Sequence, residues 1–269
     1  MNICFIGGGN MAHALIGGLL KRDFSAAQFC VVEINADNRA KLHSTYAVRA
    51  VADMATGVAG SEVIVLAVKP QQLHEVAAQL APMLAGQMLL SIAAGIRAAD
   101  VARWAGTHNI VRAMPNTPAL IQSGITGLYA MPTVTQVQRD MAQSLLSAVG
   151  KTLWVEDEAL LDAVTAVSGS GPAYVFYFIE ALQQAGVELG LSAHDARRLA
   201  LDTFLGASKL AVGSSDEVSE LRARVTSKNG TTERALLSMD AHQVKQHIIN
   251  AAKAAAVRSQ QMGDELGSD

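Results

Sequence analysis

A glycine-rich turn near the N-terminus constrains the fold of this chain more than any other feature. The apolar run Ile3–Ile6 is followed at once by Gly7–Ala12, which reads Gly-Gly-Gly-Asn-Met-Ala, and then by an apolar helix to about Lys21. A strand that enters a G-x-G-x-x-A turn and leaves as a helix is typical of a dinucleotide-binding unit. Gly7 permits the tight turn, Gly9 lets the backbone approach a pyrophosphate, and the alanine lets the helix lie close to the strand.

Strand-like and helix-like segments alternate through the first half of the chain. Short, continuous apolar runs indicate strands that are buried on both faces. We expect strands at Ile3–Ile6, Gln28–Glu33, Val63–Val68, Met88–Ile92, Asn109–Ala113 and Gly127–Ala130, and helices at Met11–Lys21, Asp37–Ser44 and Pro70–Leu84. Alternation with short connections predicts an α/β fold, a Rossmann-type, parallel, doubly wound sheet over residues 1–157.

The second strand ends beside residues that would choose between the two nicotinamide cofactors. Glu33 ends this strand, and an acidic residue there accepts hydrogen bonds from the adenosine ribose and favours NAD. Asn35, Asn38 and Arg39 follow at once and could hold a 2′-phosphate, although they could equally start a solvated helix. NAD(H) and NADP(H) therefore both remain open.

Two more loops follow strands at the expected ligand-binding edge of the sheet. Lys69-Pro70 comes after the third strand, and we expect this turn to contact the cofactor, although Pro70 also suits an ordinary helix start. Met114–Pro118 is stiffened by two prolines. Its Asn116 can donate and accept hydrogen bonds, which suits the nicotinamide or the substrate; a plain rigid turn is the alternative.

The second half, residues 158–269, is predicted to be helical. We expect helices at about Pro172–Gly190, Ser192–Val212, Ser215–Arg224, Thr231–Met239 and Ala241–Met262, with a break at Ser168–Pro172 and disorder from Gly263. Tyr174, Phe176, Tyr177 and Phe178 are too closely spaced for one helix face, so this helix should be buried nearly all round. That favours an obligate homodimer over a monomeric bundle.

A loop in this half precedes a predicted helix and has the chemistry of an anion site. Val225–Thr232 contains hydroxyls and ends at a helix start, where unpaired N–H groups and peptide dipoles favour a small anion. An ordinary loop with an N-cap would have the same sequence.

Composition and the remaining residues exclude several classes of protein. A net charge of −3 does not indicate the basic surface that nucleic-acid binding needs, and no apolar run reaches the roughly 18 residues of a membrane span. The first basic residue, Lys21, follows the apolar N-terminus, unlike a secretory signal, so we expect a cytoplasmic protein with buried free thiols at Cys4 and Cys30. The seven histidines have no metal-ligand spacing, which favours hydride transfer to an already activated electrophile.

Five motifs occur in one order along the chain: Gly7–Ala12, Val68–Pro70, Met114–Pro118, Ser168–Tyr174 and Ser227–Thr232. This set resembles the Δ1-pyrroline-5-carboxylate reductase family over essentially the whole chain. The resemblance implies a Rossmann domain followed by an all-helical dimerisation domain, with dimers assembled into larger rings, commonly decamers. It also implies NAD(P)H-dependent reduction of 1-pyrroline-5-carboxylate to L-proline, the last step of proline biosynthesis.

The resemblance carries roles onto matching residues. The cofactor-contacting positions are Gly7, Gly9, Asn10, Met11, Ala67, Lys69 and Asn116. The substrate loop has Ser227, Gly230, Thr231 and Thr232, with Lys228 adding charge, and the substrate carboxylate is expected on the N–H groups of residues 230–232. Thr232 matches the hydroxyl proposed as proton donor; we expect it to orient the imine nitrogen, because a threonine hydroxyl is a poor acid.

One departure and two alternatives remain. Many members have Pro-Gly-Gly in the substrate loop, whereas this chain has Lys228-Asn229-Gly230; Asn tolerates the left-handed backbone better than most residues. A related hydroxyacid dehydrogenase or another imine reductase would share the architecture, but such enzymes typically use a lysine where this chain offers Tyr174. A non-catalytic dinucleotide sensor would bind cofactor without turnover.

Overall fold

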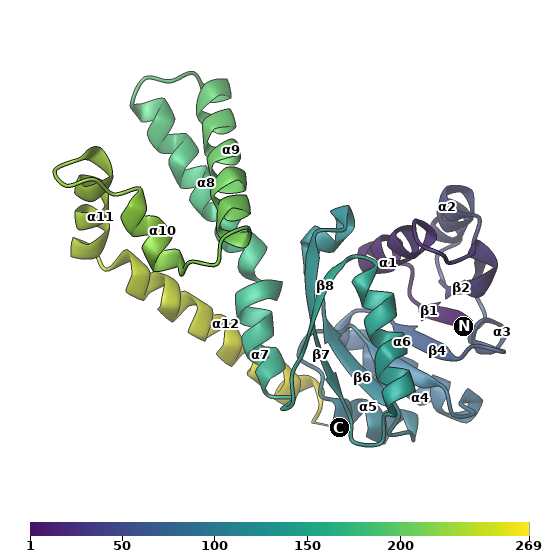
Figure 1. Ribbon diagram of the computed structural model, residues 1–269. Helices are drawn as coiled ribbons and strands as arrows, with labels where there is room; N and C mark the ends of the chain where they lie inside the picture. Colours follow the sequence, from purple (N-terminus) through teal and green to yellow (C-terminus); the bar gives the residue numbers. More distant parts are fainter. Residues whose placement is uncertain (269) are drawn as a thin grey trace. The chain divides into compact units, whose positions relative to one another are not determined.

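The computed structural model describes residues 1–268, and the chain forms two compact units. One unit contains residues 1–170 together with the C-terminal segment from Ala254, and the other contains Gly171–Lys253. The chain passes between them twice, once at the start of helix α8 and once within helix α12 (Figure 1).

An eight-stranded sheet with the order β3-β2-β1-β4-β5-β6-β7-β8 is the centre of the first unit. Its strands are β1 (Ile3–Ile6), β2 (Phe29–Val32), β3 (Arg49–Val51), β4 (Val63–Leu66), β5 (Met88–Ser91), β6 (Ile110–Met114), β7 (Gly124–Ala130) and β8 (Gly150–Trp154). Strands β1 to β6 are all parallel, so their carboxyl ends meet at one edge of the sheet. The connections turn in opposite directions from β1, to β2 on one side and β4 on the other, and this is the position at which open α/β sheets generally bind ligands.

Helices cover both faces of this sheet, which confirms the doubly wound α/β fold (Figure 1). One face is covered by α1 (Asn10–Leu20), α2 (Ala36–Tyr46) and α6 (Gln136–Ser147), and the other by α3 (Met54–Val58), α4 (Pro70–Leu80) and α5 (Ala98–Ala105). Alternate residues of each strand face opposite layers. In β1, Ile3 and Phe5 pack in the first core, and Cys4 and Ile6 pack in the second. This double burial explains the continuous apolar runs of the sequence.

Two edges of the sheet differ from the prediction. Strands β3 and β8 were not expected, because they lie at the two ends of the sheet and their residues are only partly buried. The sheet is not entirely parallel, because β7 runs antiparallel to β6 while β8 runs parallel to β7. Strand β7 also begins three residues before the predicted Gly127. The missing side chain of Gly127 leaves room for Val164, since a Cβ there would approach Val164 Cγ1 to 2.7 Å.

The α-helical pattern is interrupted around Ser168–Pro172, as predicted, by a π-helical turn and a bend at Ser170. Helix α7 (Leu160–Val164) continues as a π-helical turn at Thr165–Gly169, and α8 (Gly171–Glu188) begins after the bend at Ser170. A π-helical turn widens a helix without ending it and is frequent at functional sites.

The disorder predicted from Gly263 is wrong for residues 263–266, which are helical. Helix α12 (Val244–Leu266) extends three residues past this glycine, and Gly263 is buried. A Cβ at Gly263 would approach the Gly95 carbonyl oxygen to 2.7 Å, so the glycine permits close packing on the loop between β5 and α5. The guanidinium of Arg103 also donates to the carbonyl of Gly267 at 2.6 Å. These contacts pack residues 263–267 against the rest of the first unit.

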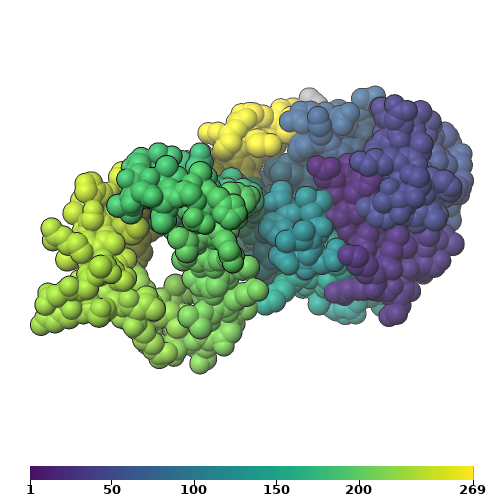
Figure 2. All heavy atoms as spheres, turned by 90° about the horizontal axis from the view of Figure 1, so that it is seen from above, coloured from purple at the N-terminus to yellow at the C-terminus, as the bar shows by residue number. Residues whose placement is uncertain are grey.

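The second unit is helical, as predicted, but has almost no core of its own. It contains α8, α9 (Ala193–Val212), α10 (Val218–Arg224), α11 (Thr231–Ala241) and the first part of α12. No residue of α8 is buried in the single chain, and Phe176 and Tyr177 are 64% and 71% exposed. Figure 2 shows an opening among the helices coloured green to yellow-green. The apolar faces that the sequence predicts to be covered are therefore not covered within one chain.

Candidate active site

The glycine turn after β1 has the geometry that the sequence predicts. Gly7 has φ +99°, and a Cβ there would approach the Ala67 carbonyl oxygen to 2.7 Å. Both the backbone conformation and the lack of space therefore disfavour any residue with a side chain. Gly9 is the N-cap of α1 and has no neighbour within 4 Å of a Cβ position. The first turn of α1 contains no acidic residue and no side-chain cap. The backbone N–H groups of Asn10 and Met11, at the start of the helix, can therefore donate hydrogen bonds to a phosphate.

Glu33 is held against this turn by three hydrogen-bond donors. Its Oε2 accepts from the Gly8 amide at 3.1 Å and from Asn38 Nδ2 at 2.8 Å, and its Oε1 accepts from the Asn35 amide at 2.9 Å. Burial alone would raise the pKa of Glu33, but the hydrogen bonds from Asn35, Asn38 and Gly8 outweigh it and lower the pKa. An ionised carboxylate has about four acceptor positions. The three donors leave about one for a ribose hydroxyl.

Asn35 and Arg39 support the end of β2. The side chain of Asn35 caps helix α2, since its Oδ1 accepts from the Asn38 amide at 2.8 Å. Arg39 Nη1 donates to the carbonyl oxygens of Glu33 and Ile34, both at 2.8 Å. This anchors the guanidinium, and thus a positive charge, at the backbone that follows β2.

The loop after β4 lies at the same edge of the sheet. The Ala67 amide donates to the Ile6 carbonyl at 2.8 Å, which places Ala67 directly beside the glycine turn. Lys69 is the exposed N-cap residue of α4, and Pro70 occupies the first turn of that helix. Lys69 is thus positioned where the carboxyl end of a strand meets the amino end of a helix.

Asn116 joins two of the sequence motifs. It follows β6, and its Oδ1 accepts from the Ile125 amide at 3.0 Å while its Nδ2 donates to Ser168 Oγ at 3.3 Å. Gly169 packs against the end of β6, since a Cβ there would approach Met114 Cε to 2.4 Å. The π-helical turn therefore contacts both β6 and Asn116, one of the candidate cofactor-contacting residues. Ser168 lies in a motif that the sequence singles out, but no role was predicted for its hydroxyl.

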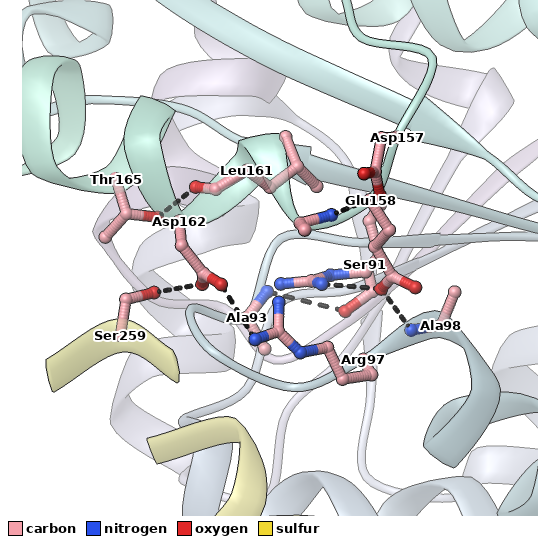
Figure 3. A network of polar contacts seen from close by, with 12 residues as sticks. Ser91, Ala93, Arg97, Ala98, Asp157, Glu158, Leu161, Asp162, Thr165 and Ser259 are labelled. Carbon is pink, nitrogen blue, oxygen red and sulfur yellow. Dashed lines mark hydrogen bonds and ion pairs between the residues drawn. The ribbon is translucent and has the colours of Figure 1, made fainter. Parts of the chain in front are cut away.

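A buried ion-pair network, which the sequence did not predict, lies beside the end of β5 (Figure 3). Arg112, 4% exposed on β6, donates to Glu158 Oε1 at 2.5 Å, and the Ala98 amide donates to the same oxygen at 2.6 Å. Arg97 donates to Asp162 Oδ2 at 2.7 Å. The arginine within the apolar strand Ile110–Met114 was the available signal, because a buried charge needs a partner.

The substrate-loop candidates lie in the second unit. Ser227–Gly230 form a turn in which the Gly230 amide donates to the Ser227 carbonyl at 3.0 Å. This amide, expected from the sequence to hold the substrate carboxylate, is thus already paired. Gly230 instead provides space, because a Cβ there would approach Ser227 Oγ to 2.5 Å. It is also the N-cap of α11, where no side chain caps the amides of Thr231 and Thr232.

The side chains around this turn differ in exposure. Ser227, Lys228 and Thr231 are exposed, and Thr232 is half-buried. Lys228 is thus an exposed basic residue in the turn that leads into α11. The first unit brings together Gly7, Gly9, Glu33 and Ala67, and the second brings together residues 227–232.

Two classes of feature are missing from residues 1–268. No cluster of three or more His, Cys, Asp or Glu side chains is arranged to hold a metal ion in this part of the chain. None of the helices between residues 1 and 268 combines the length and the apolar character that crossing a membrane requires.

Known proteins resemble the chain along its whole length. A family model described as pyrroline-5-carboxylate reductase dimerisation matches residues 158–262, and one described as NADP oxidoreductase, coenzyme F420-dependent, matches residues 2–95. A pyrroline-5-carboxylate reductase of Pseudomonas aeruginosa is 48% identical, covering 98% of both chains.

Solved structures agree with these matches. The structure of a pyrroline-5-carboxylate reductase from Coxiella burnetii superposes with a TM-score of 0.92 at 38% identity, covering 97% of this chain and 98% of the other. A Plasmodium falciparum pyrroline carboxylate reductase, with NADP bound, superposes with a TM-score of 0.88 at 28% identity, covering 98% of both chains.

Proposed function

Since the chain belongs to the pyrroline-5-carboxylate reductase family, we propose that it reduces 1-pyrroline-5-carboxylate to L-proline, with NADPH or NADH as the reductant. This is the last step of proline biosynthesis. The observation that carries the proposal is the Ser227–Gly230 turn, which leads directly into the uncapped N-terminus of α11. The substrate is a small anion, and such a helix start binds anions.

The glycine turn fits the pyrophosphate of the cofactor. The open space above Gly9 and the uncapped start of α1 would admit a phosphate to the amides of Asn10 and Met11. Gly7 keeps the turn close to Ala67, and Lys69 and Pro70 would border the cofactor from the loop after β4. Asn116 would contact the nicotinamide end.

Glu33 and Arg39 would determine the choice between the two cofactors. Glu33 would accept a ribose hydroxyl with its remaining acceptor position, and Asn35 would support it by donating from its amide. The anchored guanidinium of Arg39 offers a positive charge to a 2′-phosphate.

The substrate loop would hold the imine by its carboxylate. The amides of Thr231 and Thr232 would donate to the carboxylate, with Ser227 beside them and Lys228 adding positive charge. Gly230 keeps the turn tight enough to aim these amides. When bound, the nicotinamide cofactor supplies the hydride that reduces the C=N bond.

Thr232 would orient the imine nitrogen. The hydroxyl of this half-buried residue would hydrogen-bond the nitrogen and retain the proton that makes the imine carbon electron-poor. Positioning then supplies much of the rate, because the protonated imine is already activated. A threonine hydroxyl is too weak an acid to protonate the nitrogen efficiently on its own.

We also propose an obligate homodimer in the cytoplasm, with dimers joined into a decamer. The match to the dimerisation family and the uncovered apolar faces of α8 and α9 support a homo-oligomer. Analytical ultracentrifugation at several concentrations tests both levels of assembly, since a dimer and a decamer differ fivefold in mass.

The test of the function is steady-state oxidation of NADPH and of NADH with 1-pyrroline-5-carboxylate. We expect turnover by the wild type, a large loss of kcat/KM in Thr232→Ala, and recovery in Thr232→Ser, which keeps the hydroxyl. An unchanged kcat/KM in Thr232→Ala would remove the orienting role. Cofactor binding without turnover of this imine would contradict the proposal and favour a dinucleotide sensor or a reductase of another imine.

A further inference from the structure

The turn in the substrate loop requires a left-handed residue that this chain supplies without glycine. Asn229 has φ +60°, whereas Lys228 is not among the residues with positive φ, and the Gly230 amide closes the turn onto the Ser227 carbonyl at 3.0 Å. This pattern is a type II turn with Lys228 and Asn229 at its two central positions. Pro at the first and Gly at the second central position favour that turn most.

Lys228 and Asn229 hold this turn less firmly than proline and glycine would at the same two positions. Lysine does not fix its own φ as proline does, and asparagine enters the left-handed region less readily than glycine. Without another contact, the loop of this chain would leave the turn more often.

Glu233 supplies that contact. It lies in the first turn of α11 and is half-buried, and its Oε2 accepts from the Asn229 amide at 2.6 Å. A glutamate at the third helical position normally reaches back to the amide of the N-cap residue. Here it reaches one residue further, past the N-cap Gly230, to the residue with the left-handed backbone.

We propose that Glu233 is a positioning residue for substrate binding, which holds the Lys228-Asn229 turn closed so that the amides of Thr231 and Thr232 are aimed at the substrate carboxylate. This inference rests on the proposed function of the loop. Glu233 does not contact the imine in this account; it acts through Asn229. Because its negative charge lies near an anion site, its benefit must come from the order it gives to the turn.

The expected kinetic effect is on KM. If only a fraction of molecules has the turn closed, apparent affinity falls by that fraction, whereas saturating substrate restores the closed state. For Glu233→Ala we expect KM for 1-pyrroline-5-carboxylate to rise about five- to tenfold, with kcat and the KM for NADPH nearly unchanged. Glu233→Gln keeps an oxygen acceptor and should stay within about twofold of the wild type.

Glycine at position 229 should replace the function of Glu233. In Glu233→Ala/Asn229→Gly, the glycine enters the left-handed region without help, so we expect KM to return toward the wild-type value. Asp195→Ala is the matched control, because Asp195 is also a first-turn acid and contacts its N-cap Ser192, with Oδ2 accepting from Ser192 Oγ at 2.7 Å. We expect it to leave KM unchanged.

Hydrogen–deuterium exchange of the peptide that contains residues 226–232 gives a readout that is independent of turnover. Exchange should be faster in Glu233→Ala and slower again in the double variant. If the wild type did not reduce this imine, the proposed function would fail, and exchange alone would still decide whether Glu233 orders the turn. An unchanged KM in Glu233→Ala, a lowered KM in Glu233→Ala and Glu233→Gln, or no rescue by Asn229→Gly would overturn the inference.

Discussion

Ser259 on α12 donates to Asp162 on α7 at 2.7 Å, although 97 residues separate them. Both residues are buried, at 4% and 9% exposure, and the other oxygen of Asp162 accepts from Arg97 (Figure 3). Helices α7 and α12 are thus joined by a hydrogen bond, and an ion pair joins α7 to the loop after β5. This carboxylate on α7 is thus the common partner of two segments that are distant from it in sequence, the loop after β5 and α12.

Removing this carboxylate should destabilise the protein strongly. Asp162→Ala would leave the partly buried guanidinium of Arg97 without its ion-pair partner, at a cost of about 3 kcal/mol or more. Ser259→Ala removes one hydrogen bond to a charged group, which costs roughly 1.5–3 kcal/mol. Urea unfolding at a fixed protein concentration measures both. Ser44→Ala is the control, because the exposed Ser44 only donates to the Lys41 carbonyl and should change stability by less than about 0.5 kcal/mol.

Lowering the pH should reduce the stability of the protein by protonating Glu33, which accepts a hydrogen bond from the glycine turn. The hydrogen bonds lower the pKa of Glu33 below the usual 4.5, so its ionised form contributes stability above pH 4.5. That contribution is lost as pH falls from 4.5 through the lowered pKa. Glu33→Gln lacks it at every pH, since an amide NH₂ would face one of the donors from Gly8, Asn35 or Asn38. The stability difference between wild type and Glu33→Gln, measured by denaturation from pH 7 to pH 3, should therefore narrow in acid. A constant difference would contradict this.

Gly9→Ala should separate cofactor binding from folding. Gly9 has φ −75° and no neighbour within 4 Å of a Cβ, so alanine fits the free protein and should leave its stability equal or slightly higher. The added methyl group would occupy the space proposed for the pyrophosphate. We expect the Kd for NADPH, measured by calorimetry, to rise at least about tenfold. Unchanged affinity would mean that the pyrophosphate does not lie above Gly9.

Gly7→Ala is the contrasting variant at the same turn. Its positive φ and the contact with the Ala67 carbonyl should destabilise the protein even without cofactor. A loss of stability in Gly7→Ala but not in Gly9→Ala would assign the first glycine to the fold and the second to the ligand.

The sequence predicted those parts of the molecule that neighbouring residues in the chain determine. Strands β1 and β4 are buried on both faces and give continuous apolar runs, and the glycine turn is read from adjacent residues. The edge strands β3 and β8 are only partly buried, so their apolar signal is weak. Arg112 was visible as a charge within an apolar strand, but its partner Glu158 is 46 residues away.

The substrate loop shows how local and distant information combine. The resemblance identified Ser227–Thr232, yet it could not show that the Gly230 amide is used by the turn, because that depends on backbone torsions. Asn229 was a usable signal, since asparagine is the residue most often accepted after glycine at left-handed positions. The contact from Glu233 follows only when the turn type is known.

The uncovered face of α8 should be an interface between two copies of this chain. Phe176 is 64% exposed in the single chain, and it lies in the segment that matches the dimerisation family. Phe176→Asp would bury a carboxylate without a partner in such an interface, so we expect dissociation toward monomers in analytical ultracentrifugation. Val137→Asp is the control, because Val137 is equally apolar and 68% exposed but lies on α6, outside that segment. If Phe176→Asp kept the wild-type mass, this face of α8 would not be the interface, and the exposed apolar residues of α9 would be tested next.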